Sequence, residues 1–320
     1  MEVKENALEP GGSQLPACYE KIKPYIHKTP VLTSRLINDI TGAEVYFKCE
    51  NFQRMGAYKM RGATHALLQL TDEERSKGVV THSSGNFAQA LALAARTLNV
   101  TAHIVMPTSA PEVKKKGVLE YGGIIYECEP TLAARNAAAA EIQQKTGAVF
   151  LHPSNDPNVI LGQGTAAFEL LQDYPQLNYL LLPVGGGGLI AGSALAAAYF
   201  GNNCKVIGTE PFEVDDAYRS LKSGKIEENK TTNTVADGLK TQLGSNTLPV
   251  ILDKVERIIR VEEQEIIAAM RLIWERMKIV VEPSSAVALA GLYRERSLFK
   301  EKQVGIIISG GNVDLSSLPF

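Results

Sequence analysis

The sequence predicts a two-lobed α/β fold, in which parallel or mixed sheets carry helices on both faces. Short apolar runs that suit buried strands alternate with helical patterns over most of the chain. At 320 residues, the chain is also longer than one small domain usually needs. A third observation indicates a ligand site: four consecutive glycines, residues 185–188, join an expected strand to an expected helix.

The expected strands are rich in apolar residues and are bounded by turn residues. They are Val79–His82, Ala102–Met106, Ile124–Glu127, Val149–His152, Tyr179–Val184, Lys205–Thr209, Arg257–Val261 and Val304–Ser309. The main helical stretches are Phe87–Leu98, Leu132–Lys145, Gly164–Leu171 and Glu263–Met277. Three successive strand–helix units predict a small domain, residues 76–150, inserted into a large cofactor-binding domain of residues 1–75 and 151–320.

Composition and charge exclude several classes of protein. The 33 basic and 35 acidic residues give a net charge of −2, so no basic field exists to attract nucleic acid. Residues 180–200 are apolar, but Pro183 and five glycines interrupt them, so we expect no membrane span. The four cysteines lack a CxxC pair and residues 1–16 lack a signal-peptide core, which indicates free thiols in a cytoplasmic protein.

The four glycines predict a phosphate site. Bare backbone N–H groups at a strand-to-helix turn converge on an anion, and the helix N-terminus favours negative charge. Gly186, Gly188 and Ala191 fit the relaxed dinucleotide pattern G-x-G-x-x-A, and Glu210 follows the next strand where a ribose-binding carboxylate would lie. An NAD-dependent dehydrogenase is therefore one interpretation. Contiguous glycines favour instead a single phosphate, such as that of pyridoxal phosphate, and no G-K-[ST] follows to indicate a Walker A loop.

Three other segments contain reactive or anion-binding groups. Lys59, in Gly56–Ala63, is either a surface lysine or a buried amine whose lowered pKa would let it form a Schiff base with an aldehyde. The segment Thr81–Asn86 holds two serines, Gly85 and an asparagine at a helix start, more than one helix cap needs, and suits a carboxylate. The strand within Ile306–Asn312 ends at Ser309, which would otherwise begin a plain turn.

Taken in order, these segments resemble the fold-type II pyridoxal-phosphate enzymes (the tryptophan synthase β-like fold), most closely the serine racemase and serine/threonine dehydratase branch. The similarity extends from Thr29 to Leu315. It implies that Lys59 bonds covalently to the cofactor, Asn86 bonds the ring hydroxyl, Glu282 lies beside the ring and Ser309 faces the pyridine nitrogen. The backbone N–H groups that would hold the phosphate are those of Gly185, Gly186, Gly187, Gly188 and Leu189.

The resemblance also implies sites for substrate, metal and nucleotide. The substrate carboxylate would bind at Ser83, Ser84, Gly85 and Asn86, with Arg135 near the substrate side chain. A Mg²⁺, Ca²⁺ or Mn²⁺ site would use Glu210, Asp216 and the carbonyl of Val214, which gives Glu210 a second interpretation. In a homodimer, activating ATP would contact Gln89, Lys114, Tyr121 and Lys278.

We therefore expect a serine racemase that also eliminates water from L-serine or L-threonine. Racemisation needs a proton-transfer group on each face of the substrate, here Lys59 and Ser84. A neutral Ser309 suits elimination or quick reprotonation better than transamination. Ala57, Tyr58, Phe87 and Ser154 depart from the family pattern near the expected pocket, and so bear on the choice among serine, threonine, aspartate and 3-hydroxyaspartate.

The alternatives to a racemase fall into different classes. Among enzymes they are a dedicated dehydratase of serine, threonine or 3-hydroxyaspartate, a β-replacement synthase and the NAD-dependent dehydrogenase. A binding protein that has lost its chemistry is the remaining one. Each would act on a small molecule, without nucleic acid or membrane.

Overall fold

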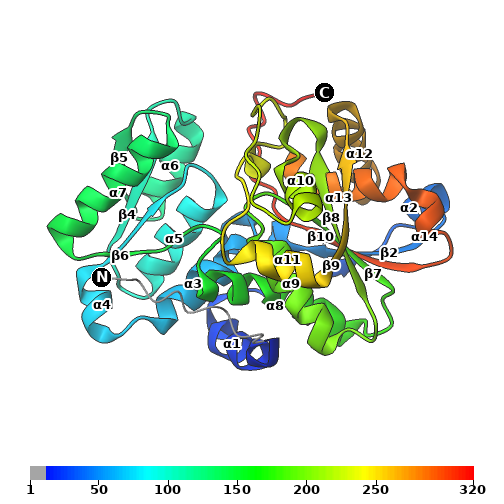
Figure 1. Cartoon of the computed structure of the whole chain (residues 1–320), viewed down its shortest axis with the longest axis horizontal. Coiled ribbons are helices and arrows are strands. Elements are labelled where there is room, and N and C mark those ends of the chain that lie inside the picture. Colours follow the sequence, from blue (N-terminus) through cyan, green and yellow to red (C-terminus); the bar gives the residue numbers. More distant parts are fainter. Residues whose placement is uncertain (1–11) are drawn as a thin grey trace.

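The strands of the chain form two separate sheets. The computed structural model describes residues 12–320; residues 1–11, with which the predicted large domain begins, lie outside the described residues. Within the described part, one sheet has six strands and the other has four. Figure 1 shows the two sheets side by side, with the four-stranded sheet and its helices on the left.

The large sheet has the strand order β1-β2-β10-β7-β8-β9. All neighbouring strands are parallel except β1 and β2, which are antiparallel. The last strand of the chain, β10, therefore lies in the interior of the sheet between β2 and β7. The strands are β1 (Val31–Leu32), β2 (Glu44–Cys49), β7 (Tyr179–Pro183), β8 (Lys205–Pro211), β9 (Val255–Val261) and β10 (Gln303–Ile308).

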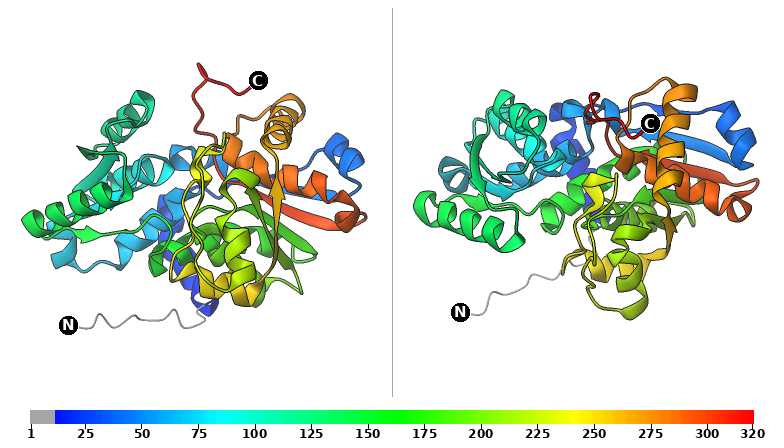
Figure 2. Two further views of the ribbon diagram at one scale, coloured as in Figure 1. Left: turned by 45° about the horizontal axis from the view of Figure 1, so that its top comes forward. Right: turned by 90° about the horizontal axis from the view of Figure 1, so that it is seen from above.

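Helices cover both faces of the large sheet. Successive strand residues face opposite ways, so Leu180 and Leu182 belong to one buried core and Leu181 to another. Figure 2 shows the green helices α8 and α9 on one side of this sheet and the orange helices α12 and α13 on the other. The helices of this part are α1 (Leu15–Ile22), α2 (Arg35–Thr41), α3 (Lys59–Gln69), α8 (Pro157–Asp173), α9 (Gly188–Phe200), α10 (Asp216–Ser223), α11 (Thr247–Lys254), α12 (Glu263–Met277), α13 (Pro283–Arg294) and α14 (Arg296–Phe299).

The small sheet is parallel throughout, with the order β5-β4-β3-β6. Val79 packs in the same core as helix α5, whereas Val80 packs against Ala139 and Ile142 of α7 on the other face. The elements are α4 (Asp72–Lys77), β3 (Val79–His82), α5 (Asn86–Thr97), β4 (Ala102–Pro107), α6 (Glu112–Glu120), β5 (Ile124–Cys128), α7 (Leu132–Thr146) and β6 (Val149–Phe150). The predicted fold class is confirmed. The four strands lie inside the predicted small domain, whose boundaries stay a prediction.

Two smaller expectations can also be compared with the structure. Cys18, Cys49, Cys128 and Cys204 are free thiols, as predicted. Between residues 12 and 320, no helix combines the length and the apolar character that a bilayer crossing requires.

Candidate active site

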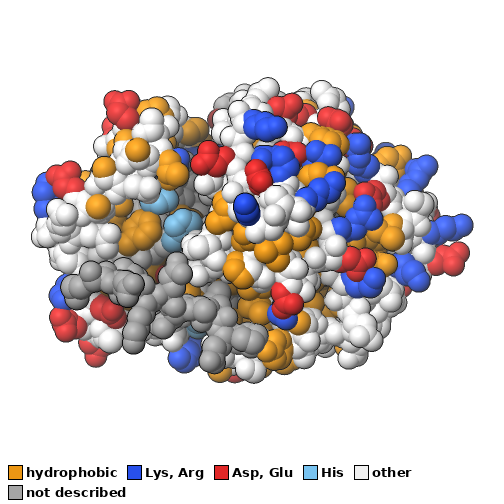
Figure 3. Space-filling model, in the orientation of Figure 1, with side chains coloured by type: hydrophobic (Ala, Val, Ile, Leu, Met, Phe, Trp, Pro, Cys, Tyr) orange, Lys and Arg blue, Asp and Glu red, His pale blue; other side chains and the backbone are white. Residues whose placement is uncertain are grey.

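A cavity of about 510 Å³ brings together the segments that the sequence singled out. It lies where β3, β7 and β10 end and α3 begins, as expected for ligand sites of parallel sheets. Figure 3 shows histidine side chains in the hollow between the two parts of the molecule. Its volume suits a small-molecule site. The predicted residues that line it are Lys59, Ser83, Ser84, Gly85, Asn86, Lys114, Arg135, Gly185, Gly186, Gly187, Gly188, Leu189, Glu282 and Ser309.

The four glycines form a tightly packed turn at one end of this cavity. Helix α9 begins at Gly188, and Gly187 has φ +81°, which a side chain would disfavour. A Cβ atom on Gly186 would come within 2.2 Å of Ser154 Oγ, and one on Gly188 within 2.6 Å of Gln163 Oε1. Since the first N–H groups of a helix lack intrahelical partners, this end of the cavity suits an anion.

Lys59 is the first residue of α3, and its amine lies inside the cavity. Nζ donates a hydrogen bond to the carbonyl oxygen of Pro153 at 2.9 Å. The ring centroids of Tyr58 and Phe87 lie 5.0 and 5.9 Å from Nζ. Burial lowers the pKa of Lys59 to about 7, although the carboxyl group of Glu282 opposes the shift. Near neutral pH the amine is thus neutral in a substantial fraction of the molecules, and a nucleophilic lysine requires this form.

Asn86 and Glu282 are hydrogen bonded to each other across the cavity. Asn86 Nδ2 donates to both carboxyl oxygens of Glu282, at 2.9 and 3.1 Å. Asn312 Nδ2 donates in turn to Asn86 Oδ1 at 2.8 Å, which fixes the orientation of the Asn86 amide. Burial, and then Asp237, raises the pKa of Glu282 to about 7. Sequence reasoning missed the contribution of Asn312, although it belongs to the motif that contains Ser309.

Ser309 follows the last residue of β10, and its hydroxyl group contacts a second serine. Its Oγ lies 2.9 Å from Ser285 Oγ. The Ser285 hydroxyl donates to the carbonyl oxygen of Gly310 and accepts from the Gly310 N–H, at 2.6 and 2.7 Å. Ser309 therefore offers a neutral hydroxyl to a ligand atom that reaches this end of the cavity.

The residues expected to bind substrate lie between β3 and α5 and on α7. Ser83, Ser84 and Gly85 form the turn that leads into α5, where Ser83 Oγ accepts the Gly85 N–H at 3.4 Å. Arg135 lines the cavity from α7, and its Nε donates to the carbonyl oxygen of Thr131 at 3.4 Å. Among residues 12–320, no acidic side chain forms an ion pair with Arg135.

Two histidines of the cavity were not predicted as site residues. His82 and His152 have ring centroids 5.6 Å apart. His152 Nδ1 accepts backbone N–H groups of Ser154 and Asn155, at 3.2 and 2.9 Å, so the ring proton lies on Nε2. Burial, and then His82, lowers the pKa of His152 to about 4, which makes it a neutral hydrogen-bond donor. Each of the two histidines is the last residue of a predicted strand, a signal that could have found them.

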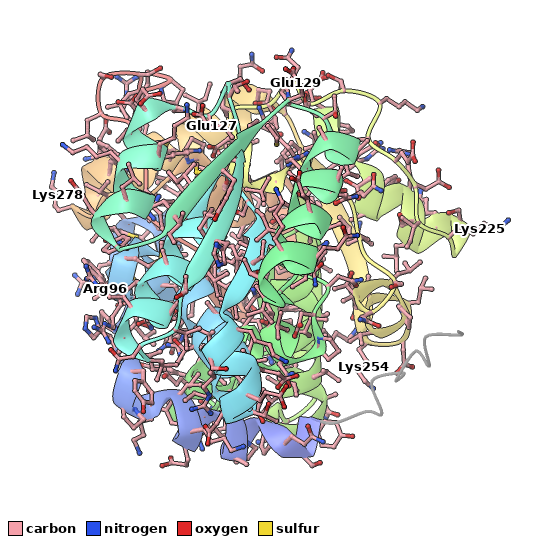
Figure 4. The ribbon with its side chains drawn as sticks, turned by 90° about the vertical axis from the view of Figure 1, so that its left-hand side faces the viewer. Arg96, Glu127, Glu129, Lys225, Lys254 and Lys278 are labelled. Atoms are coloured by element: carbon pink, nitrogen blue, oxygen red, sulfur yellow. The ribbon has the colours of Figure 1, made fainter. Side chains whose placement is uncertain are left out.

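The four residues expected to contact ATP have different surroundings. Lys114 of α6 forms an ion pair with Asp237, which joins the two parts of the molecule beside the cavity. Gln89 lies on α5 close to Gly117 of α6, and Tyr121 directly follows α6. Lys278 directly follows α12 and points into solvent in Figure 4. Of the four, Lys114 is the one that lines the cavity.

The residues expected to bind a metal meet away from the cavity. Glu210 accepts the N–H groups of Ala217 and Tyr218, at 3.1 and 2.9 Å. Asp216 Oδ2 accepts the N–H of Leu243 at 3.1 Å, while its buried Oδ1 has no partner. Burial, and then Asp216, raises the pKa of Glu210; burial raises that of Asp216 to about 7. In the described part of the chain, no cluster of three acidic, histidine or cysteine side chains suits a metal. The predicted site therefore has two side-chain ligands, the carboxylates of Glu210 and Asp216, and a backbone carbonyl as the third.

Comparison with known proteins identifies the class of this site. Residues 22–310 match the family model described as pyridoxal-phosphate dependent enzyme. The chain belongs to this family. The alternative of a nicotinamide dehydrogenase gains no support, because Glu210 does not line the cavity that holds the glycines.

Individual relatives extend the likeness over almost the whole chain. A β-hydroxyaspartate dehydratase of Paracoccus denitrificans is 47% identical, over 95% of this chain and 96% of its own. An L-threo-3-hydroxyaspartate ammonia-lyase of Saccharomyces cerevisiae is 47% identical, over 92% and 91%. The crystal structure of serine racemase from Dictyostelium discoideum superposes with a TM-score of 0.91 at 46% identity, covering 95% of this chain and 99% of that one.

The neutral Lys59 amine leads to a first prediction. Only the neutral amine can attack an aldehyde, so uptake of pyridoxal phosphate by the cofactor-free protein is expected to accelerate with pH around a midpoint near 7. Between pH 7 and 10.5 the unfolded chain also binds more protons at this lysine than the folded chain, so the free energy of unfolding rises with pH. Absorbance after rapid mixing measures the first effect, and denaturation of Lys59→Met beside the unmodified chain measures the second. An uptake midpoint near 10.5, the usual lysine value, would contradict the prediction.

Proposed function

We propose that this chain is a pyridoxal-phosphate-dependent serine racemase that also eliminates water from L-serine. The observation that carries the proposal is the presence of Lys59 and Ser84, two groups able to transfer protons, in one cavity with a carboxylate-binding turn. The names of the relatives that share most of the chain's length support the same class of reaction.

The cavity has the donors that pyridoxal phosphate needs. The glycine turn and the start of α9 would hold the phosphate, since a side chain at Gly186 or Gly188 would collide with the protein behind it. Lys59 would hold the aldehyde end, Asn86 the ring hydroxyl and Ser309 the ring nitrogen. When bound, the cofactor supplies an aldehyde that condenses with amines and a conjugated ring that withdraws electrons from the α-carbon.

The residues of the chain would divide the proton transfers between two faces of the substrate. The N–H groups and hydroxyls of Ser83–Asn86 would hold the α-carboxylate at the start of α5. Lys59 would remove or return the α-proton on one face, and Ser84 on the other. Ser309 leaves the ring nitrogen without a negative partner, so a proton removed at the α-carbon is quickly replaced or a β-group is lost.

Elimination requires a donor for the departing hydroxyl rather than a second base. His152 carries its proton on Nε2 and stays neutral, so it supplies a hydrogen-bond donor inside the cavity over the whole neutral pH range. Racemisation and elimination would therefore share Lys59 and differ in their dependence on Ser84.

A second candidate function is the dehydration of 3-hydroxyaspartate. It is favoured by Arg135, a guanidinium group beside the cavity without an acidic partner among the described residues, which could pair with a second substrate carboxylate. Two of the relatives carry hydroxyaspartate in their names.

Product analysis tests the proposal directly. The holoenzyme is incubated with L-serine, D-serine, L-threonine and the 3-hydroxyaspartate isomers, and products are separated by chiral chromatography with a parallel keto-acid assay. The proposal expects D-serine and pyruvate from L-serine. Formation of neither from serine, with oxaloacetate from hydroxyaspartate, would establish the second candidate instead.

The proposal includes a divalent cation, Mg²⁺ before Ca²⁺ or Mn²⁺, at Glu210, Asp216 and the Val214 carbonyl. The unpartnered Oδ1 of Asp216 and the mutual repulsion of two buried carboxylates support it, because a cation would satisfy both.

Saturating Mg²⁺ or Ca²⁺ is expected to raise Tm by several degrees. Ligand at 100 times its Kd adds about 2.7 kcal/mol to the stability of the folded state. Asp216→Asn should remove this increment, whereas Glu213→Gln, an exposed acid of the same loop, should keep it. Differential scanning calorimetry with and without chelator checks the effect, and equal increments in the two variants would place the cation elsewhere.

The remaining parts of the proposal are a homodimer, activation by ATP and a cytoplasmic location, with the two-domain division predicted above. The proximity of Gln89 to helix α6, which Tyr121 directly follows, supports a nucleotide site there, while Lys114 forms an ion pair with Asp237. The four free thiols support a reducing compartment.

A further inference from the structure

Arg61 lies two residues after Lys59 on α3 and is completely buried. Its guanidinium group binds two carboxylates at once. Nε and Nη2 donate to Glu50, at 2.7 and 2.8 Å, and Nη1 and Nη2 donate to Glu169, at 2.8 and 3.0 Å. Nη1 also contacts Thr165 Oγ1 at 3.3 Å. Arg61 thus ties α3 to the end of β2 and to α8.

The carboxylates that bind Arg61 belong to a closed set of four buried charges. Lys48 of β2 donates to Glu169 at 2.5 Å and to the carbonyl oxygen of Thr29 at 2.8 Å. Lys48, Glu50, Arg61 and Glu169 are at most 1% exposed, and their charges cancel. Apolar side chains in place of buried ion pairs are often neutral or stabilising, so stability alone does not account for these four charges. Charges of this kind can instead select one arrangement of the elements that carry them.

Helices α3 and α8 approach each other closely beside Arg61. A Cβ atom on Gly62 would lie 2.7 Å from the carbonyl oxygen of Val159, and one on Gly162 would lie 2.7 Å from that of Arg61. The two backbones therefore approach each other closely at these glycines, with side chains of both helices beside the contact. The hydrogen bond between His65 Nδ1 and the carbonyl oxygen of Asn158, at 2.8 Å, also connects α3 with α8. The bonds from Arg61 to Glu169 and Thr165 of α8 add a charged connection that lies nearer to Lys59 in the sequence.

Lys59 depends on the rotation of α3. Successive helical residues are about 100° apart, so Arg61 projects from the side of α3 opposite to Lys59. Before Lys59, the chain is held by the bond from Tyr58 N–H to the Ser309 carbonyl at 3.0 Å. After Lys59, Arg61 is the first side chain of α3 that is held by ion pairs. A rotation of α3 would move the Lys59 amine out of line with the substrate.

We propose that Arg61 is a positioning residue, which fixes the rotation of α3 so that the Lys59 amine faces the α-carbon of the substrate. This inference rests on the proposed function, in which Lys59 and Ser84 exchange protons on opposite faces. On this inference, the four buried charges affect how fast protons are transferred and how the transfer is divided between the two faces of the substrate.

Arg61→Lys tests the proposal in the holoenzyme, because lysine keeps the charge but cannot bind two carboxylates through a planar fork. Lys48→Arg is the matched control, a charge-conserving exchange in the same set of four charges, but on β2. Each variant is assayed for Tm, for kcat and KM, and for α-proton exchange of L-serine and D-serine separately in D₂O. Both variants are expected to lower Tm.

Arg61→Lys alone is expected to lower kcat by about 10- to 100-fold with little change in KM, as small misplacements of reacting groups do. Exchange of the enantiomer whose proton Lys59 removes should slow more than that of the other, which Ser84 serves. A loss of folded enzyme would slow both equally. If Arg61→Lys fails to fold, Thr165→Val, which removes a single contact to Arg61, should change the enantiomer ratio in the same direction.

An unchanged ratio in a folded Arg61→Lys holoenzyme, or an equal change in Lys48→Arg, would overturn the inference. Exchange of neither enantiomer by the unmodified holoenzyme would overturn the proposed function instead. The two failures are therefore distinguishable.

Discussion

Replacing Lys59 with alanine is expected to lower kcat for L-serine by on the order of 10⁴-fold or more, for racemisation and elimination alike. Under the proposed function, the substitution would remove both the covalent attachment of the cofactor and a proton-transfer group. It leaves the glycine turn, Asn86 and Ser309 in place, so cofactor should still bind non-covalently. Treatment with borohydride followed by mass spectrometry should show a fixed cofactor adduct in the unmodified enzyme and none in Lys59→Ala.

The matched control is Lys225→Ala, an exposed lysine that points away from the cavity (Figure 4). It should retain the adduct, kcat and Tm. A borohydride-stable adduct in Lys59→Ala at another lysine would show that the attachment site has been assigned to the wrong residue.

Ser84→Ala is expected to separate the two reactions. Removal of one acid–base group should lower racemisation by about 10²- to 10⁴-fold. Pyruvate formation from L-serine should change little, because elimination needs Lys59 and a donor for the leaving hydroxyl but no second base. Chiral chromatography and a coupled pyruvate assay on the same samples give the ratio of the two rates.

Ser83→Ala is the informative comparison, since Ser83 lies in the same turn and contacts the backbone N–H of Gly85. It should weaken both reactions together, through binding of the α-carboxylate. Racemisation that survives in Ser84→Ala would mean that another group serves the second face, and His82 and His152 would be the first to examine.

The sequence predicted where the candidate site residues follow the ends of parallel strands. The Ser83–Asn86 turn, the glycine turn and Ser309 all follow strands whose apolar runs are visible without a structure, and the ends of parallel strands meet at one edge. The strand β2 was missed because Lys48 interrupts its apolar pattern. That lysine is buried because Glu169, 121 residues later, neutralises it. A charge in a core cannot be recognised before its partner is known.

Other features of the site arise from tertiary packing and could not be predicted. Tyr58 and Phe87 were visible as departures from the family pattern, but the lowered pKa of Lys59 depends on how far the fold buries the amine. The Lys114–Asp237 ion pair joins residues 123 positions apart. The bonds that orient Asn86 come from Glu282 and Asn312, which are remote in sequence.

The interior position of β10 has a consequence for the synthesis of the chain on the ribosome. Strand β2 pairs with β10 within residues 303–308, and β10 joins β2 to β7. Until residues 303–308 emerge, the large sheet consists of two fragments, each with an open edge that another chain could occupy. The four strands of the small sheet are complete by residue 150 and can form much earlier. A nascent chain truncated before residue 303 should therefore contain a folded small sheet and an aggregation-prone, unclosed large one, so the emergence of β10 is the event that completes the large sheet.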